Sequence, residues 1–138
     1  MITDSNITIF NRRVTAEGSE ILFPTIIRGV TWYYAHKTGG TQYIDNADSY
    51  SVRVPINADQ SGKTYVDGVT YSSMDDAEAE NHWTIQKQDI VVRGELTGKV
   101  TDQTELTSAT DDIFLVSTFA NNTIRGSRRV KHWRIGGE

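Results

Sequence analysis

Apolar residues recur at every second position in several short segments of this chain, and this alternation limits its fold more than any other feature. The clearest case is 50–56, where four apolar residues alternate with Ser51, Arg53 and Pro55. Because successive side chains on a strand point to opposite faces, this pattern predicts a half-buried β-strand. Pro55 cannot donate a ladder hydrogen bond, so we expect it at a strand end or on an edge strand.

Further segments with the same period or with a β-rich composition predict a set of strands at 7–14, 20–36, 48–56, 89–96, 113–120 and 128–135. Glu17-Gly18-Ser19 predicts a tight turn between the first two, since glycine accepts a positive φ. Pro24 is expected to bend or end the second strand before it resumes at Thr25. The last two strands are expected to form a hairpin around 121–126.

Helix signals are few. Ser72 to Glu80 begins with serines that can cap a helix and has acids in its first turn, which predicts a helix of about two turns. A second short turn of helix is expected within 101–108. The chain has 138 residues, a common size for one domain.

These patterns predict a single all-β domain over residues 1–138, a small antiparallel β-barrel or sandwich with long inter-strand loops and one or two short helices. The side chains expected in its core are Trp32, Val52, Val54, Ile90, Val92, Leu115 and Trp133.

Composition and motifs exclude several classes of protein. The absence of cysteine excludes disulfides, cysteine-bound metals and thiol nucleophiles. No run approaches the ~20 apolar residues of a membrane helix, and the first ten residues lack the basic and apolar regions of a signal peptide. We therefore expect a protein made in a cytoplasm, without a membrane partner.

No motif points to catalysis. The three histidines have no metal-binding spacing, and the acid pairs Asp75-Asp76 and Asp111-Asp112 fit a helix start and a turn better than a general acid and its partner. The segment 59–63 has a faint likeness to a calcium loop, but Lys63 stands at a ligand position. We expect no catalytic residue, no metal site and no cofactor, and hence no enzyme.

The charges are unevenly distributed, although the net charge is only −4. The acidic segment, 75–80, has no base and contains Asp75, Asp76, Glu78 and Glu80. The basic segment, 125–134, has no acid and contains Arg125, Arg128, Arg129, Lys131 and Arg134. Such segments are solvated faces of one monomer, matching patches on two copies of the chain, or a nucleic-acid surface.

Two polar excursions are candidate binding loops, with plain hairpin tips as the alternative. The first polar loop contains Lys37, Thr38, Gly39, Gly40, Thr41 and Gln42. The second polar loop lies within 57–63 and contains Asp59, Gln60, Ser61, Gly62 and Lys63.

Two binding functions stay open as more distant alternatives. Basic residues near Trp133, with Trp32, Tyr33 and Tyr34 elsewhere, are a mixture that small barrels use for single-stranded nucleic acid. The negative net charge argues against it, and aromatic residues also fill small β cores. A carbohydrate-binding module would present Tyr33 on one face, or Trp32 with Tyr34 on the other.

Four segments resemble small virion proteins encoded among the head–tail genes of tailed bacteriophages and prophages of Gram-positive bacteria. They are 1–11 (MITDSNITIFN), 29–33 (GVTWY), 89–94 (DIVVRG) and 130–137 (VKHWRIGG). The resemblance implies a head completion or head-to-tail stopper protein of the neck, a small β-barrel that assembles as a homo-oligomeric ring in the host bacterial cytoplasm. The implied partners are a portal or adaptor protein on the head side and a tail terminator or tail tube protein on the tail side.

The resemblance also gives the candidate residues roles. The two polar loops become candidate channel loops that help to retain DNA, with possible non-specific contact with it. The acidic and basic segments become the two patches of a head-to-tail ring interface. A helix near 72–81 has no expected place in a minimal stopper barrel, so a tail terminator or another neck or tail protein is the nearest alternative.

Overall fold

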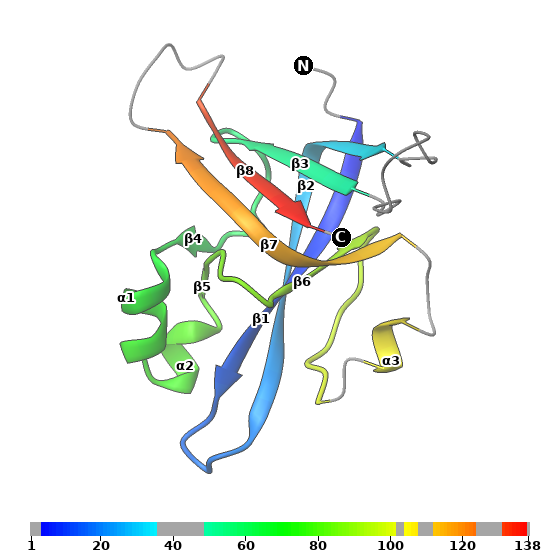
Figure 1. The fold of residues 1–138 in the computed structure, drawn as a ribbon. Coiled ribbons are helices and arrows are strands. Elements are labelled where there is room, and N and C mark those ends of the chain that lie inside the picture. Colours follow the sequence, from blue (N-terminus) through cyan, green and yellow to red (C-terminus); the bar gives the residue numbers. More distant parts are fainter. Residues whose placement is uncertain (1–3, 36–48, 102–103, 108–111, 124–130, 138) are drawn as a thin grey trace.

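The computed structural model of the chain describes residues 4–35, 49–101, 104–107, 112–123 and 131–137. Within these ranges, six strands form a closed barrel in the order β1-β2-β3-β8-β7-β6, with every neighbouring pair antiparallel (Figure 1). The strands are β1 (Ser5–Val14), β2 (Glu20–Ala35), β3 (Ser49–Pro55), β6 (Ile90–Arg93), β7 (Ile113–Asn122) and β8 (His132–Gly137). The all-β class is confirmed, and each predicted strand overlaps one of these six.

Strands β1 and β2 form a long hairpin whose closed end projects beyond the barrel (Figure 1). Its turn has Gly18 at φ +86°, as the glycine in the sequence predicts. The first part of β2 pairs with β1, and from Thr31 onward β2 pairs with β3. β2 therefore joins two parts of the barrel wall.

Pro24 lies inside β2 and does not end it, so the expectation of a break there is wrong. Leu22 and Arg28 direct their backbone groups away from β1, toward Val100 and Asp59. Pro24 is an even number of residues from both, so the N–H that it lacks would also point away from β1. No ladder hydrogen bond is lost, which is the condition under which a strand tolerates proline.

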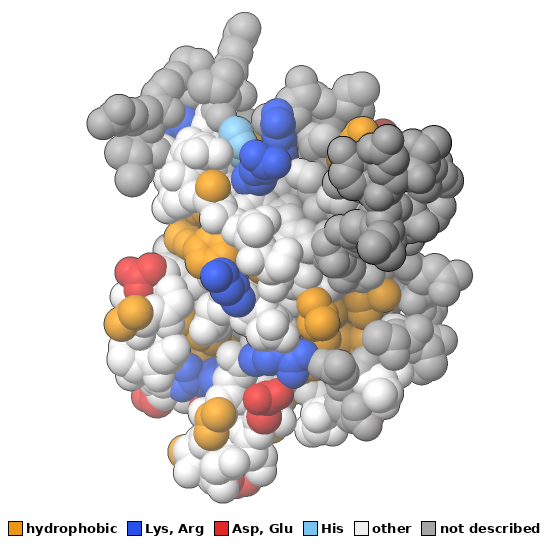
Figure 2. Space-filling model, in the orientation of Figure 1, with side chains coloured by type: hydrophobic (Ala, Val, Ile, Leu, Met, Phe, Trp, Pro, Cys, Tyr) orange, Lys and Arg blue, Asp and Glu red, His pale blue; other side chains and the backbone are white. Residues whose placement is uncertain are grey.

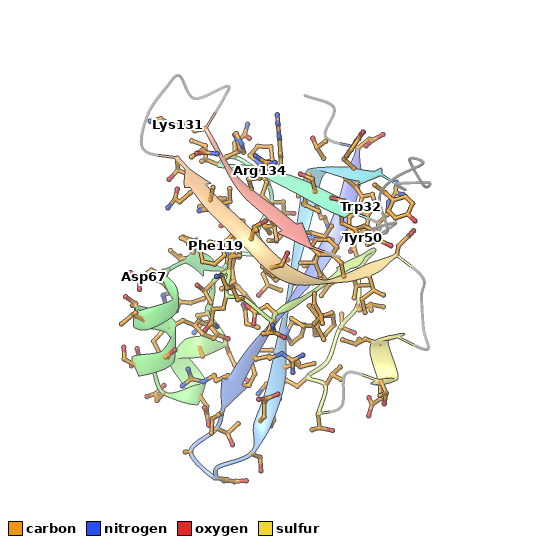
Figure 3. All side chains as sticks on the ribbon, viewed as in Figure 1. Trp32, Tyr50, Asp67, Phe119, Lys131 and Arg134 are labelled. Carbon is orange, nitrogen blue, oxygen red and sulfur yellow. The ribbon has the colours of Figure 1, made fainter. Side chains whose placement is uncertain are left out.

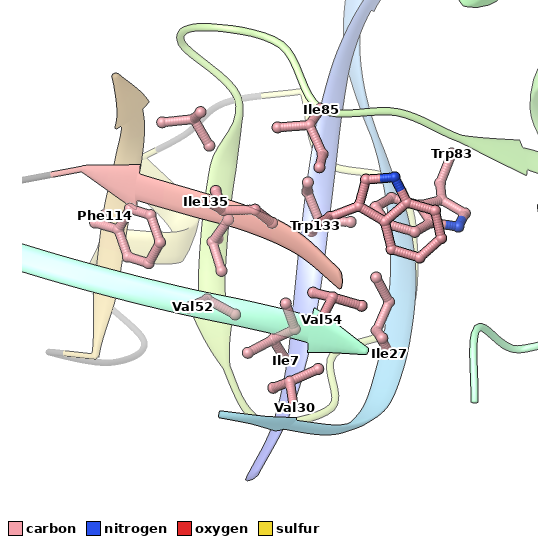
Figure 4. Packing of buried hydrophobic residues seen from close by; sticks show 13 residues of the cluster. Ile7, Ile27, Val30, Val52, Val54, Trp83, Ile85, Phe114, Trp133 and Ile135 are labelled. Atoms are coloured by element: carbon pink, nitrogen blue, oxygen red, sulfur yellow. The ribbon is translucent and has the colours of Figure 1, made fainter. Parts of the chain in front are cut away.

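The core fills the inside of the barrel (Figure 4). Its main cluster combines inward-facing strand residues with two residues from the segment before β6: Ile7, Ile9, Ile27, Val30, Val52, Val54, Trp83, Ile85, Val91, Phe114, Val116, Trp133 and Ile135. A second cluster lies beside it and contains Phe10, Leu22, Ile90, Val92 and Leu106.

Five of the seven predicted core residues are buried, and Trp32 and Leu115 are not. Leu115 is 37% exposed because β7 directs its neighbours Phe114 and Val116 inward. Trp32 is half-buried and packs edge-on against Tyr50, with their ring centroids 5.5 Å apart. It covers the margin of the core instead of filling it.

The expected helix at 72–80 is two shorter helices, α1 (Gly68–Ser73) and α2 (Asp76–Ala79). The side chain of Asp67 caps α1 by accepting from the backbone N–H of Thr70 at 2.7 Å, and Asp75 caps α2 in the same way. The serines expected as caps are the last residues of α1. The prediction of one helix was wrong because the residues that cap are aspartates, Asp67 before these serines and Asp75 after them.

Three small elements complete the described chain. α3 (Thr104–Thr107) falls within the predicted 101–108. β4 (Thr64–Tyr65) and β5 (His82–Trp83) form a parallel pair that the sequence does not predict. No helix in the described ranges is both long enough and apolar enough to cross a membrane.

Candidate functional site

A groove runs over the outer faces of β2, β3 and β8 and has a volume of about 470 Å³. Its position follows from strand alternation, since Val52, Val54 and Ile135 point into the core and the residues between them point outward. The residues that line it are Thr31, Tyr33, Ser49, Ser51, Arg53 and Arg134.

Two arginines face each other across this groove. Arg53 and Arg134 are direct partners in the β3–β8 ladder. Opposed residues in an antiparallel pair have Cα atoms about 4.5–5.5 Å apart, and like charges in such positions destabilise the sheet. Neither guanidinium has an ion-pair partner among the residues that the structure describes. The groove therefore concentrates two positive charges that the described chain does not neutralise.

The next row of the sheet contains an aromatic ring and a glycine over which the Thr118 side chain packs. Tyr33, Ser51 and Gly136 are partners across β2, β3 and β8, and the Tyr33 side chain is 62% exposed. Gly136 adds no side chain, and a Cβ there would lie 2.7 Å from Oγ1 of Thr118. The groove thus combines a tyrosine ring and hydroxyl groups with its arginines.

This surface continues into a wider basic region. Figure 2 shows Lys and Arg side chains beside a histidine in the upper part of the view, where Figure 3 labels Lys131 and Arg134. Lys131 immediately precedes β8. The described end of the basic segment therefore adds to the charge of the groove.

Three other arginines pair with carboxylates, whereas Arg93 on β6 bonds to the Ser5 hydroxyl and packs over the ring of Trp32. Arg28, exposed on β2, bonds to Glu95 at 2.8 Å and to Asp59 at 3.2 Å. These hydrogen bonds raise the pKa of Arg28, and the bond from Arg28 lowers the pKa of Glu95. Arg12 and Arg13 also pair with carboxylates. Arg53 and Arg134 differ from all three.

The acidic segment is partly neutralised within the chain. Asp76 pairs with Arg13 at 3.1 Å, Glu80 pairs with Lys99, and Asp75 caps α2. Glu78 is exposed. Figure 1 shows α2 away from β8, so the fold does not bring the acidic segment together with the described end of the basic segment.

Several candidate residues lie outside the described residues. They are the whole first polar loop, 37–42, and Arg125, Arg128 and Arg129 of the basic segment. Their proposed roles stay predictions.

The second polar loop lies along the open edge of β2. The backbones of Asp59 and Arg28 exchange two hydrogen bonds, of 2.8 and 3.1 Å. The Ser61 hydroxyl donates to the carbonyl of Ile26 at 2.6 Å. Further along, Lys63 Nζ donates to the carbonyl of Pro24 at 2.7 Å. The loop therefore covers strand groups that would otherwise be free to pair with another chain.

The side chains of this loop, which has a faint likeness to a calcium loop, make contacts within the protein instead. Lys63 directs its ammonium group to a backbone carbonyl and to the Thr25 hydroxyl, at 3.1 Å from the latter. Burial lowers the pKa of Lys63. Gln60 accepts from the indole N–H of Trp83 at 2.9 Å, which fixes the loop to the core. Among the described residues, no group of three His, Asp or Glu side chains is placed to hold a metal ion.

A second hollow, of about 570 Å³, lies between α1 and β7. Its lining is mostly apolar and includes Val69 and Phe119, which are 84% and 45% exposed. Asp67 and Lys87 lie among its lining residues, and Figure 3 labels Phe119 and Asp67 on this side of the molecule. We call it the apolar pocket.

One buried carboxyl lies in the interior, apart from both surfaces. Asp89 is fully buried and accepts hydrogen bonds from Asn11 Nδ2 at 2.7 Å and from the backbone N–H groups of Arg12 and Gln86 at 3.0 and 3.1 Å. Burial raises the pKa of Asp89 to about 7, although the N–H groups lower it. Asp89 ties β1 to the turn before β6, and we assign it to the fold.

The groove was only partly predictable. Alternation at 50–56 already places Arg53 outward, and Tyr33 and Arg134 were candidate residues. Nothing in the sequence gives the register that opposes Arg53 to Arg134. Ser49, Ser51 and Thr31 were missed for the same reason.

The fold and these surfaces define a small closed β-barrel with an arginine-lined groove and a separate apolar pocket. The chain belongs to a family described as "Family of unknown function (DUF6751)", whose model matches residues 2–138. No curated protein matches the chain, and no solved structure matches it.

Proposed function

We propose that this protein is a virion structural protein of the neck of a tailed bacteriophage, a stopper or head completion protein. In this role it forms a ring that joins the portal complex of the capsid to the tail and helps to retain DNA. One observation supports the proposal most directly. The four segments that resemble such proteins contribute to β1, β2, β6 and β8, four strands of one closed barrel. A small β-barrel is the fold that the resemblance implies.

The surfaces of the barrel are suited to assembly. A closed ring needs a heterologous contact, in which one patch meets a different patch of the next copy. The apolar pocket provides the kind of apolar centre that holds such contacts. Next to it in the chain, the exposed Glu78 and the N-terminal carboxylate of α2, Asp75, provide negative charge for orientation.

We propose that this helical side of one copy meets the basic segment of its neighbour at Lys131, which precedes β8, and not at Arg134, which lies in the groove. Charge complementarity would then set the encounter rate and register, while apolar burial holds the contact. The intramolecular pairs of Asp76 and Glu80 leave the remaining carboxylates as the ones available for this purpose.

Disruption of the gene in the genome that carries it tests this function. We expect lysates that contain heads which have lost DNA, together with separate tails of normal length, and restoration of complete particles by the intact gene. Tails of abnormal length beside DNA-filled heads would instead identify a tail terminator. Normal tailed, infectious particles would contradict a role in the neck.

A further inference from the structure

We propose that the groove between Arg53 and Arg134 binds phosphate groups of a DNA backbone. The inference deepens the proposed function by naming the surface and the chemical group through which the barrel meets DNA. It rests on the neck assignment only for the source of that DNA. Binding itself is a property of the isolated protein and can be measured without any virus particle.

The first argument is the uncompensated charge. The fold holds two guanidinium groups opposite each other on neighbouring strands, where like charges cost stability. The exposed Arg28 is balanced by carboxylates, and Arg93, which has no carboxylate partner among the described residues, packs over the ring of Trp32 and bonds to Ser5. A local arrangement that breaks a stability rule without compensation is typical of a functional surface. The missing partner of this pair is an anion.

The second argument is the chemistry of the lining. A guanidinium group presents a planar set of N–H donors that matches phosphate oxygens. Two of them on adjacent strands can bind one phosphate together or two successive phosphates of a strand. Ser49 and Ser51 add hydroxyl groups to the same outer face, and hydroxyl groups are common donors to DNA phosphates.

The third argument is the size and shape of the groove. At about 470 Å³ it lies in the size range of small-molecule sites, enough for about one or two nucleotide units, and it is lined along parts of three strands. The exposed ring of Tyr33 borders it. A tyrosine ring gives a sugar or a base an apolar surface to pack against. A backbone segment uses all of these features, whereas a lone carboxylate uses only the arginines.

The net charge of −4 sets the expected strength. A local basic groove on an acidic protein binds DNA weakly and without sequence preference. We expect a Kd within about 10⁻⁶ to 10⁻⁴ M, the usual range of non-specific binding, with strong salt dependence. Weak contact of this kind lets DNA move past the surface.

Fluorescence anisotropy of a labelled duplex, titrated with the whole protein at several salt concentrations, tests the inference. Each phosphate contact contributes about 0.9 to the slope of log K against log salt. We therefore expect Arg53→Gln and Arg134→Gln each to lower the slope by about 1, and the double variant by about 2. The double variant should also lose about tenfold or more in affinity at low salt.

Arg28→Gln is the matched control. It removes the same charge from an exposed arginine of the same barrel, but Arg28 is already paired with Glu95 and Asp59. Its affinity and slope should stay close to those of the wild type. Thermal melts should show the groove variants folded, because removal of one of two opposed charges relieves repulsion. They should also show Arg28→Gln folded, because exposed ion pairs contribute little to stability.

Two results would overturn the inference. One is a double variant that is folded and keeps the wild-type affinity and salt slope. The other is inorganic tripolyphosphate that displaces the duplex at an equal phosphate concentration, which would identify a site for small polyphosphates. Neither result depends on the gene-disruption phenotype, so failure here and failure of the neck assignment are distinguishable.

Discussion

Asp89 is the residue whose surroundings depart most from those of an ordinary carboxyl. Burial raises its pKa to about 7, from 3.8, and its hydrogen bonds join β1 to the turn before β6. A carboxyl with a raised pKa in the folded state keeps its proton over a range in which the unfolded chain has lost it. The stabilisation is fully present below about pH 4 and is lost as the pH rises through about 7.

We predict that the free energy of unfolding falls by about 2 kcal/mol between pH 5 and pH 7.5 because of this group. Asp59, Asp67, Asp76 and Glu95 have lowered pKa values, so their contributions change only at lower pH. Urea denaturation across this range measures the effect.

Asp89→Asn serves as the comparison for the same pH series, since all other titrating groups remain. It should be less stable at pH 5, because the amide NH₂ group would face N–H groups that donate to the carboxyl in the wild type. We expect this mismatch to lower the free energy of unfolding by about 1–3 kcal/mol. It should also lose the pH slope. An identical slope in both proteins would show that Asp89 titrates normally.

Trp133 is the largest buried group on β8 and lies against Trp83 and Tyr65, with ring centroids 5.2 and 4.9 Å away. We predict that Trp133→Ala lowers the free energy of unfolding by about 3–5 kcal/mol, the usual effect of emptying a core aromatic site. Trp133→Phe should lose much less, because it keeps a ring in the cluster. Chemical denaturation gives both values, and an unchanged midpoint for Trp133→Ala would place this residue outside the core.

At the scale of elements, the second polar loop stabilises the barrel by covering the edge of β2. Lys63→Met keeps the apolar stem of the side chain and removes the ammonium group that caps the carbonyl of Pro24. We predict a loss of about 1–2 kcal/mol in stability, together with more self-association through the uncovered edge of β2.

Glu17→Met is the control for that variant, since Glu17 is an exposed charged residue in the β1–β2 turn, away from this edge and from the apolar pocket. Urea denaturation and light scattering at equal concentrations distinguish the two proteins. Equal stability and equal scattering would show that the loop does not protect the edge.

The elements also show where sequence patterns suffice. Alternation found all six barrel strands because outward polar residues mark the phase of most of them. It gave the wrong inward face for β7, because 113–116 is an unbroken apolar run and either choice of face buries apolar residues. The break expected at Pro24 was wrong because the sequence does not tell which side of a strand is paired. The helix bounds were wrong because serine and aspartate are about equally good caps, so the sequence does not tell which of them begins a helix.

At the scale of the whole molecule, the barrel presents its charged groove and its apolar pocket on different elements. The groove belongs to β2, β3 and β8, and the pocket belongs mainly to α1 and β7. This separation is compatible with a ring in which subunits meet through the helical side and DNA passes the arginines. The sequence could predict the charges but not this separation, which depends on long-range strand pairing.

The central claim is that copies of this barrel form a ring between the head and the tail of a phage particle. Electron cryo-microscopy of virus particles purified after induction of the genome that carries this gene tests it most directly. We expect ring density at the head–tail junction into which the six-stranded barrel fits, with Arg53 and Arg134 facing the central channel. A neck fully accounted for by other chains, in particles from which mass spectrometry recovers no copy of this protein, would contradict the claim.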